Sequence, residues 1–328
     1  MKKIVSYIVV LCLALSLIQV AAVAEEISFA DMPDNWATDA LQKAANNGLL
    51  SGYDDGTIRP DNNLTRAEMA AIMVRAFGAT QETDISAFSD VSADAWYYSD
   101  MAKSVQMGIF QGDGTNLNPD NNITREEAFT VLARAFELTD ADGAVLDVFV
   151  DKADVSAWAV PTVAAIVENG YAQGADGYLN PGSNITRAEF AVLMDNLVKM
   201  YITEPGVYSH VEDGNILIRA NDVTLSTLTV RGDLILGESI TAKGVTLLSS
   251  SVEGRIVNND SGDKIEFVTT GGIDNPGTNP GTNPGTNPGT NPGTNPGTNP
   301  GTNPGGDPDD GDNPGEATDP GIDDGGDI

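Results

Sequence analysis

The stretch NITRAEF, residues 184–190, has two near-copies upstream: NLTRAEM at residues 63–69 and NITREEA at residues 122–128. In each copy a Thr-Arg pair precedes apolar residues at helical spacing, so each copy predicts the first turn of a helix. The threonine and the glutamate three positions later fit a capping box, in which each side chain satisfies the other residue's backbone amide. The predicted cap residues are Thr65 with Glu68, Thr124 with Glu127, and Thr186 with Glu189.

An arginine follows the cap in all three copies: Arg66, Arg125 and Arg187. A helix N-terminus carries positive partial charge, so a cation at this position is unfavourable by roughly a few tenths of a kcal/mol. Free helix amides beside a planar guanidinium make an anion site, and we therefore expect these arginines to bind a ligand. The alternative is a solvated arginine, or one that pairs with a loop aspartate such as Asp61 or Asp120.

The three copies belong to repeats of roughly 60 residues, and each repeat is expected to form a helix, a loop and a second helix. One helical hairpin of this size buries too little surface to be stable alone, so the three units should pack together. Every repeat also has a tryptophan followed by two glycines at fixed spacing. The tryptophans are Trp36, Trp96 and Trp158, and the second glycines are Gly52, Gly112 and Gly174.

Each tryptophan has two interpretations. Its place at the start of an amphipathic helix favours a core anchor, whereas an exposed indole edge would suit the apolar face of a sugar. The second glycines are expected to serve tight turns, which also let backbone amides approach a ligand.

The composition changes after the third repeat. Between residues 207 and 268 apolar and polar residues alternate, with many Val, Ile, Leu and Thr, which predicts strands. A spacing of 22 residues predicts a parallel β-helix or a similar solenoid, with a small β-sandwich as the alternative. The residues that recur at this spacing include Val223/Val245, Val230/Val252 and Leu234/Ile256.

The two ends of the chain have distinct compositions. A basic pair, an apolar core and a small-residue cleavage site predict a secretory signal peptide in residues 1–24, with an uncleaved membrane anchor as the alternative. The one cysteine, Cys12, lies inside this segment, so we expect no disulfide. NPGT repeats and acidic residues fill 271–328 and predict a disordered spacer.

The charge of the chain restricts its partners. The 17 basic and 48 acidic residues give a formal net charge of −31, and removal of Lys2 and Lys3 with the signal peptide leaves −33. Nucleic acid and anionic lipid are poor partners for such a surface, because binding them requires basic patches. An anionic ligand must therefore be held by local basic groups, which makes the few arginines informative.

Secreted parallel β-helices include polysaccharide lyases, so an enzymatic function is a further alternative for the strand segment. That chemistry needs a carboxylate cluster for a metal and a nearby base, whereas Arg219, Arg231, Lys243 and Arg255 are scattered. The sole histidine, His210, has no serine or cysteine partner in a recognisable spacing. We therefore expect neither catalysis, nor a cofactor, nor a metal site.

On these motifs the repeats resemble S-layer homology domains. The resemblance covers residues 28–202 and rests on the glycine-rich turn and the TRAE sequence. It implies a pseudo-threefold unit around a central helical bundle, with grooves between repeats that bind anionic secondary cell-wall polysaccharide, often through a pyruvylated sugar. It also implies that the TRAE arginines contact this ligand, with the tryptophans and the second glycines as further contacts.

Two departures from the family pattern concern individual repeats. The second repeat has Glu126 beside Arg125, which predicts a neutralised arginine and a weaker groove. The third repeat has Pro161 early in its first helix, which is tolerated only within the first turn.

These observations divide the chain into a signal peptide at 1–24, repeats at 25–84, 85–145 and 146–204, a β-rich segment at 205–270 and a tail at 271–328. We expect a secreted protein of the cell surface or S-layer that is anchored non-covalently to wall polysaccharide in the peptidoglycan-associated envelope. The alternative is a structural protein that self-associates through its strands. Replacing Arg66 and Arg187 by alanine is expected to weaken binding and to leave the helices intact.

Overall fold

The computed structural model describes residues 27–241 and 244–258. The expected signal peptide, the tail and the end of the β-rich segment lie outside these residues. Buried apolar side chains form two clusters, one among the helices and one inside the strand segment. Within the described ranges, no helix combines the length and the apolar character needed to cross a membrane.

Each repeat contributes a first helix after its tryptophan and a second helix after its cap. The first helices are α2 (Thr38–Asn46), α4 (Tyr98–Gln106) and α6 (Val160–Glu168). The second helices are α3 (Arg66–Phe77), α5 (Arg125–Ala135) and α7 (Arg187–Leu197). Two 3-10 turns, η1 (Gly143–Val148) and η2 (Lys152–Asp154), lie between α5 and α6. Pro161 occupies the second position of α6, as expected, because no helical hydrogen bond is lost there.

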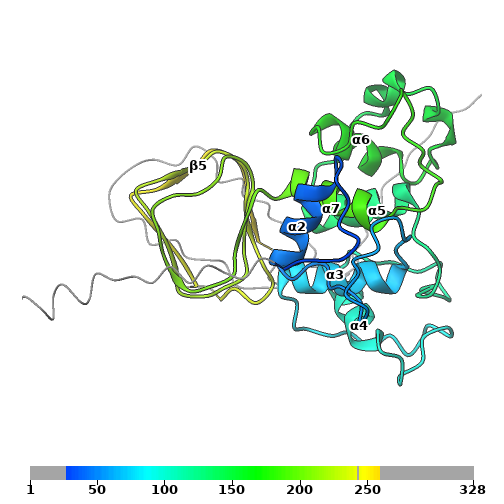
Figure 1. The fold of residues 1–328 in the computed structure, drawn as a ribbon, viewed down its shortest axis with the longest axis horizontal. Coiled ribbons are helices and arrows are strands. Elements are labelled where there is room, and N and C mark those ends of the chain that lie inside the picture. The colour runs from blue at the N-terminus through cyan, green and yellow to red at the C-terminus, as the bar shows by residue number, and fades with distance from the viewer. Residues whose placement is uncertain (1–26, 242–243, 259–328) are drawn as a thin grey trace, which may run out of the picture. The chain divides into compact units, whose positions relative to one another are not determined.

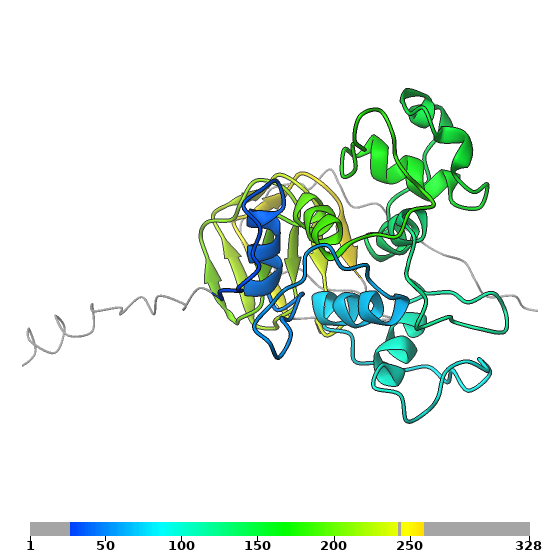
Figure 2. The ribbon, with the colours of Figure 1, turned by 45° about the vertical axis from the view of Figure 1, so that its right-hand side comes forward.

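The helices pair between repeats. α4 of the second repeat packs against α3 of the first, α6 of the third against α5 of the second, and α2 of the first against α7 of the third. Figures 1 and 2 show α2 and α7 side by side. Each repeat therefore lends its first helix to the preceding repeat in a closed cycle, and the expected helical hairpin is split between neighbours.

A ring of backbone hydrogen bonds joins the three repeats just before the caps. The amide of Leu64 donates to the Ile185 carbonyl, Ile185 to Ile123, and Ile123 to Leu64, at distances of 2.9–3.0 Å. All three side chains are fully buried. The ring gives the helical region the pseudo-threefold arrangement that the resemblance implied.

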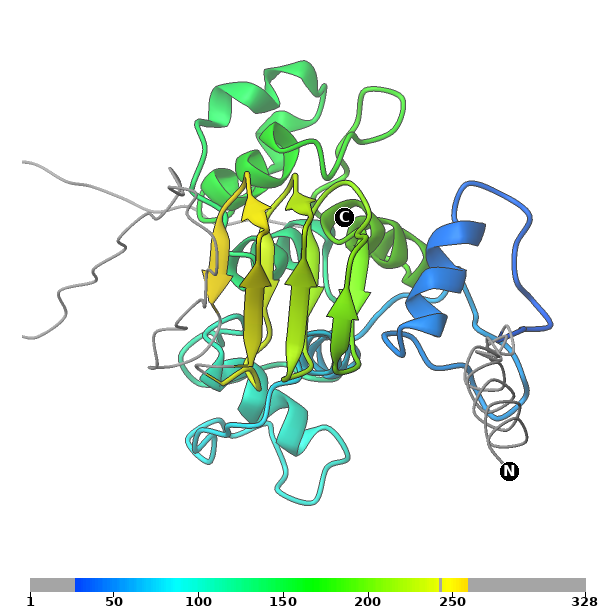
Figure 3. The same ribbon diagram turned by 90° about the vertical axis from the view of Figure 1, so that its left-hand side faces the viewer.

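The strands wind into a coil in which every strand pair is parallel. One sheet contains β1 (Met200–Ile202), β3 (Ile216–Ile218), β6 (Leu234–Leu236) and β9 (Ile256–Asn258). A second contains β2 (Gly206–Tyr208), β4 (Val223–Ser226) and β7 (Val245–Leu248), and a third contains β5 (Thr229–Val230) and β8 (Ser251–Val252). Figure 3 shows strands of the coil running side by side in one direction.

The register of the coil confirms the predicted spacing. Val223 pairs with Val245, and Leu234 pairs with Ile256. The β-sandwich alternative is wrong for the described strands, because consecutive parallel strands of one sheet are linked through the other sheets. Residues 216–218 pair with β6 in a shorter turn that the 22-residue spacing did not reveal.

The coil and the helices share apolar contacts. Leu217, Ile235 and Val257 are buried in the helical cluster, whereas their strand neighbours Ile216 and Leu234 are buried inside the coil. Strands of the four-stranded sheet are therefore buried on both faces, and β3 and β6 are apolar without interruption.

Polar groups of the coil also cap the second helices at their C-terminal ends. Arg219 donates to the last turn of α3 at 2.6 Å, and Asn215 donates to the last carbonyl of α7 at 2.9 Å. Arg255 donates to the carbonyl of Phe136, which follows α5, at 3.1 Å. A helix leaves its last carbonyls without backbone partners, so the coil satisfies one end of every second helix.

Candidate functional site

All three second helices begin with the predicted capping box. In α3 the capping box uses the amide of Glu68, and the two amides before it are occupied as well. The Arg66 amide donates to the Asn121 carbonyl and the Ala67 amide to the Pro119 carbonyl, both at 2.9 Å. These carbonyls lie in the loop of the next repeat, and α5 and α7 have equivalent bonds. The expectation that free helix amides form an anion site is therefore wrong.

The guanidinium of Arg66 holds the same loop. Its Nε donates to the Leu117 carbonyl at 2.8 Å, and one Nη donates to the Gln111 carbonyl at 3.1 Å. The other Nη lies 3.1 Å from a carboxylate oxygen of Glu127, the cap residue of the next repeat. The unfavourable position at the helix start is thus offset by three acceptors, which a planar fork of donors can reach together.

The other two arginines hold the loop of the following repeat through the same Nε hydrogen bond. Arg125 donates to the Leu179 carbonyl at 2.9 Å and pairs with Glu189 at 2.8 Å. Arg187 donates to the Ile58 carbonyl at 2.7 Å, and burial lowers the pKa of its guanidinium. Solvation, or pairing with a loop aspartate such as Asp61 or Asp120, is therefore the wrong alternative, because the acceptors belong to the following repeat.

Glu126 does not neutralise Arg125. It is buried and accepts hydrogen bonds from the backbone amide and the hydroxyl of Ser156, at 2.9 and 2.7 Å. The expectation of a weakened second arginine was wrong for this reason, since adjacent residues at a helix start point in different directions.

An aspartate in each repeat shapes the loop. The carboxylate of Asp31 accepts from the amides of Ile58 and Arg59 at 2.7 and 2.8 Å, and Asp90 and Asp151 do the same in their repeats. Each of these aspartates ends a Phe-x-Asp motif that opens its repeat: Phe29-Ala30-Asp31, Phe88-Ser89-Asp90 and Phe149-Val150-Asp151.

The second glycines are required by close packing. A Cβ atom at Gly52, Gly112 or Gly174 would overlap the phenylalanine ring of the Phe-x-Asp motif in the same repeat. Of these three, Gly174 alone has a positive φ, of 67°. The tight-turn role therefore applies to Gly174, and the other two are needed for the approach of the ring.

Three grooves lie beside the arginines, and each combines an arginine from one repeat, a loop from the next and a tryptophan from the third. Groove A is lined by Arg66, Gly112 and Trp158, groove B by Arg125, Gly174 and Trp36, and groove C by Arg187, Ser51 and Trp96. Their volumes are about 530, 540 and 180 Å³. Gly52 does not line groove C.

The tryptophans are exposed, with Trp36 at 66%, Trp96 at 67% and Trp158 at 56%. They precede the first helices, and the buried face of α2 consists of Ala40, Leu41, Ala44 and Ala45. The core-anchor interpretation is therefore wrong. Every groove instead has an accessible indole beside a guanidinium.

Sequence reasoning missed a position on each second helix that also lines a groove, nine residues after the TRAE arginine. The residues are Arg134 in groove A, Asn196 in groove B and Arg75 in groove C. The residue after the second glycine differs as well, being Asp113, Ala175 and Tyr53 in the same order. Alignment of the repeats was the signal that would have found both positions.

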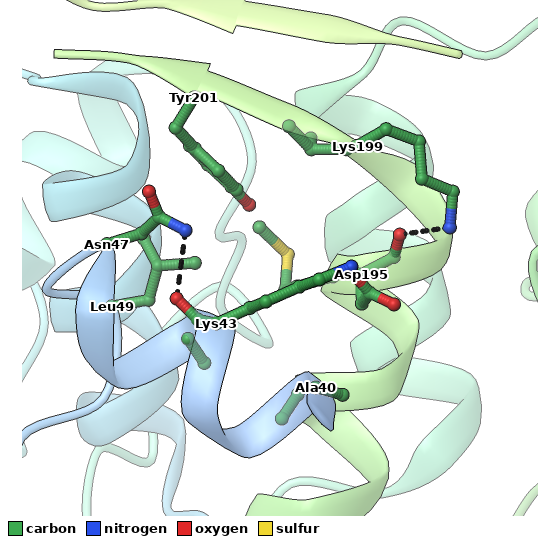
Figure 4. Close-up of a pocket in the computed structure, with 11 residues that line it drawn as sticks. Ala40, Lys43, Asn47, Leu49, Asp195, Lys199 and Tyr201 are labelled. Carbon is green, nitrogen blue, oxygen red and sulfur yellow. Dashed lines mark hydrogen bonds and ion pairs between the residues drawn. The ribbon is translucent and has the colours of Figure 1, made fainter. Parts of the chain in front are cut away.

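A separate small cavity lies between α2, α7 and β1, and its lining includes Lys43, Asp195 and Tyr201 (Figure 4). Its volume is about 20 Å³, which holds no more than one water molecule. The buried hydroxyl of Tyr201 has no hydrogen-bond partner among the described residues, and burial raises its pKa. This cavity is too small to bind a sugar.

Replacement of Tyr201 by phenylalanine is expected to raise the free energy of unfolding by about 1 kcal/mol, because it removes a buried hydroxyl that no protein group satisfies. Urea unfolding of the two chains measures the change. A loss of stability would show that the hydroxyl has a strong partner in solution.

The described residues contain no group of three or more His, Cys, Asp or Glu side chains placed to hold a metal ion. The acidic tail lies outside those residues.

The chain matches the S-layer homology domain family at residues 28–70, 87–129 and 148–191. It is 33% identical over 224 residues to the surface-layer 125 kDa protein of Lysinibacillus sphaericus, covering 66% of this chain and 19% of that protein. It is 32% identical over 185 residues to an amylopullulanase of Thermoanaerobacterium thermosulfurigenes, covering 55% and 10%. An S-layer protein of Bacillus anthracis is 28% identical over 180 residues, covering 54% and 22%. The chain thus spans less than a quarter of each relative.

The matched segments are the repeats that the fold joins into a cycle, so this is a protein with three S-layer homology domains. Such proteins are secreted and associated with the cell surface or the cell wall, and this chain shares that localisation. In general terms, the three domains form a module that anchors a protein to the cell wall.

Proposed function

We propose that the chain is held non-covalently at the wall by an anionic secondary polysaccharide, bound in the grooves between repeats and carrying pyruvate ketals. The observation that supports this most is the composition of each groove. A guanidinium and an exposed indole from different repeats face one space, next to a loop whose backbone is fixed. An indole suits the apolar face of a pyranose, and a guanidinium suits a ketal carboxylate.

The construction of the grooves also supports a role as a rigid binding module. The TRAE arginines are engaged mainly by protein acceptors, so they order the groove walls and present their remaining N–H groups to a ligand. Walls that are ordered before binding lose little conformational entropy when the polymer binds.

We propose that the chain binds and does not catalyse. Its repeats match regions of proteins with different names, an amylopullulanase among them, and the shared part is the domain-repeat region. A module common to a surface-layer protein and a carbohydrate-acting enzyme is better suited to attachment than to one reaction.

Co-sedimentation with wall sacculi tests this function. The purified chain is expected to pellet with native sacculi and to stay in the supernatant after the secondary polymer has been stripped. Equal pelleting with both preparations would contradict recognition of the polymer.

Self-association through the strand coil remains the alternative prediction. Polymerisation of the purified chain that depends on its concentration, in the absence of wall material, would favour it.

A further inference from the structure

The acidic groups of groove A are already engaged by the protein. One oxygen of Glu127 pairs with Arg66, and the other accepts from the amide of Thr124 at 2.9 Å. Asp113 accepts from two amides of its own loop at 2.9 and 2.8 Å. Loop hydrogen bonds lower the pKa of Asp113, so this carboxylate is ionised and satisfied.

Arg134 is the charged group of groove A that the protein leaves uncompensated. Its side chain lies on α5, is half-buried, and donates to the Ile109 carbonyl at a long 3.4 Å. Within residues 27–241 and 244–258, no carboxylate forms an ion pair with it. Burial lowers its pKa, which reports the cost of holding this cation away from water. A partly buried charge of this kind gains most from a counter-charge in the groove.

Groove C has an arginine at the same position but lacks the space. Arg75 donates to the Leu49 carbonyl at 2.8 Å, so its guanidinium is better satisfied than that of Arg134. The ring of Tyr53 lines the groove, 5.1 Å from the guanidinium of Arg187 and 3.8 Å from that of Arg59. Tyr53 stands where grooves A and B have the smaller Asp113 and Ala175, and the volume of groove C is about a third that of groove A.

Groove B has the space but lacks the second cation. Asn196 replaces the arginine, and its amide donates to the Tyr171 carbonyl at 3.0 Å. The one arginine of groove B, Arg125, is paired with Glu189. With Gln173 and Ala175 also in its lining, groove B otherwise offers amide and apolar groups, which suit uncharged sugar units.

We propose that groove A is the groove that selects the acidic group of the polymer, and that Arg134 is its specificity-determining residue. This inference rests on the proposed function. Arg66 has its three nitrogens engaged by protein acceptors and orders the groove, whereas Arg134 presents open donors to the anion. Groove B binds uncharged units of the same chain, and the smaller groove C contributes least to binding.

The test is calorimetric titration of the full chain with purified secondary wall polymer, in native form and with its carboxylates converted into methylamides. Arg134→Gln is expected to weaken binding of the native polymer by about tenfold to a hundredfold, the range for a charge-assisted hydrogen bond. The same variant should bind the amidated polymer about as well as the parent chain does.

Two variants control for loss of positive charge. Lys152→Gln removes an exposed cation that no groove contains, and Arg75→Gln removes the equivalent residue of groove C. Lys152→Gln is expected to bind within about twofold of the parent chain, because exposed charges are screened. Arg75→Gln makes the same change in the smaller groove C and is expected to weaken binding less than Arg134→Gln does. Arg134→Lys keeps the charge and is expected to retain preference for the native polymer.

The outcomes separate the two proposals. No binding of native polymer by the parent chain would contradict the proposed function. Binding by the parent chain with an unchanged affinity of Arg134→Gln, or with an equal loss in Arg75→Gln, would overturn the inference about groove A. If circular dichroism shows that Arg134→Gln does not fold, Arg134→Lys is the deciding variant. A folded lysine variant that shows no preference for the native polymer would also overturn the inference about groove A.

Discussion

Replacement of Arg66 by alanine is expected to lower the free energy of unfolding by about 3 kcal/mol, the lower end of the range for breaking a buried ion pair, because Arg66 is buried and Glu127 is partly exposed. The substitution leaves the carbonyls of Leu117 and Gln111 without their donors and leaves Glu127 without its cation. Because these groups belong to the next repeat, the damage falls on the contact between repeats. This expectation replaces the one from sequence, in which the helices stay intact.

Arg231→Ala is the matched control. Arg231 pairs with Asp213 at 3.2 Å, close to the 3.1 Å between Arg66 and Glu127, but both side chains of the Arg231–Asp213 pair are exposed. It should cost about 1 kcal/mol or less. In the double variant Arg66→Ala/Glu127→Gln, the second substitution removes the unpaired charge and keeps the cap. This double variant should therefore be more stable than Arg66→Ala alone. Urea unfolding measures all four chains, and similar losses for Arg66→Ala and Arg231→Ala would show that Arg66 is not a clamp.

Replacement of Ile235 by aspartate is expected to cost more than about 3 kcal/mol, because it places an unpaired carboxylate among apolar side chains. Ile235 lies on the outer face of β6 and is buried in the helical cluster. The loss should appear in the helical signal at 222 nm as well as in the strands, since the two parts share this cluster.

Val207→Asp is the control for that experiment. Val207 lies in β2 of the same coil and is 73% exposed, so the same change in charge should cost about 1 kcal/mol or less. If Ile235→Asp left the helices as stable as Val207→Asp does, the coil and the helices would be independent.

Local features of this fold were predictable because they depend on residues close together in the chain. Caps such as Thr65 with Glu68 depend on three-residue spacing, and the apolar faces of α3, α5 and α7 depend on helical periodicity. The register of Val223 with Val245 followed from one repeat length. These signals are contained in the sequence itself.

The pairing between repeats was not predictable from periodicity. An apolar face on α2 requires a partner, but α3 and α7 offer similar faces, and the choice of α7 depends on the closed cycle. The same closure brings the carbonyls of Pro119 and Asn121 to the start of α3, which removes the expected anion site.

The candidate site was predicted in part. The TRAE arginines and the tryptophans line the three grooves, as the resemblance implied, yet the arginines contact mainly protein acceptors. The differences between grooves depend on Tyr53, Arg134 and their counterparts, whose meaning appears only when three repeats surround one space. Contact with a polysaccharide stays a prediction at every one of these residues.

The central claim is that the grooves bind the wall polymer, and tryptophan fluorescence tests it most directly. The chain has three tryptophans, and one lines each groove, so the emission of the full chain reports on the grooves alone. Titration with purified native polymer is expected to give a saturable change. The change should be retained in a variant whose sole tryptophan is Trp158, and it should be smaller in a variant whose sole tryptophan is Trp96. Unchanged emission of the parent chain at every polymer concentration would contradict the account.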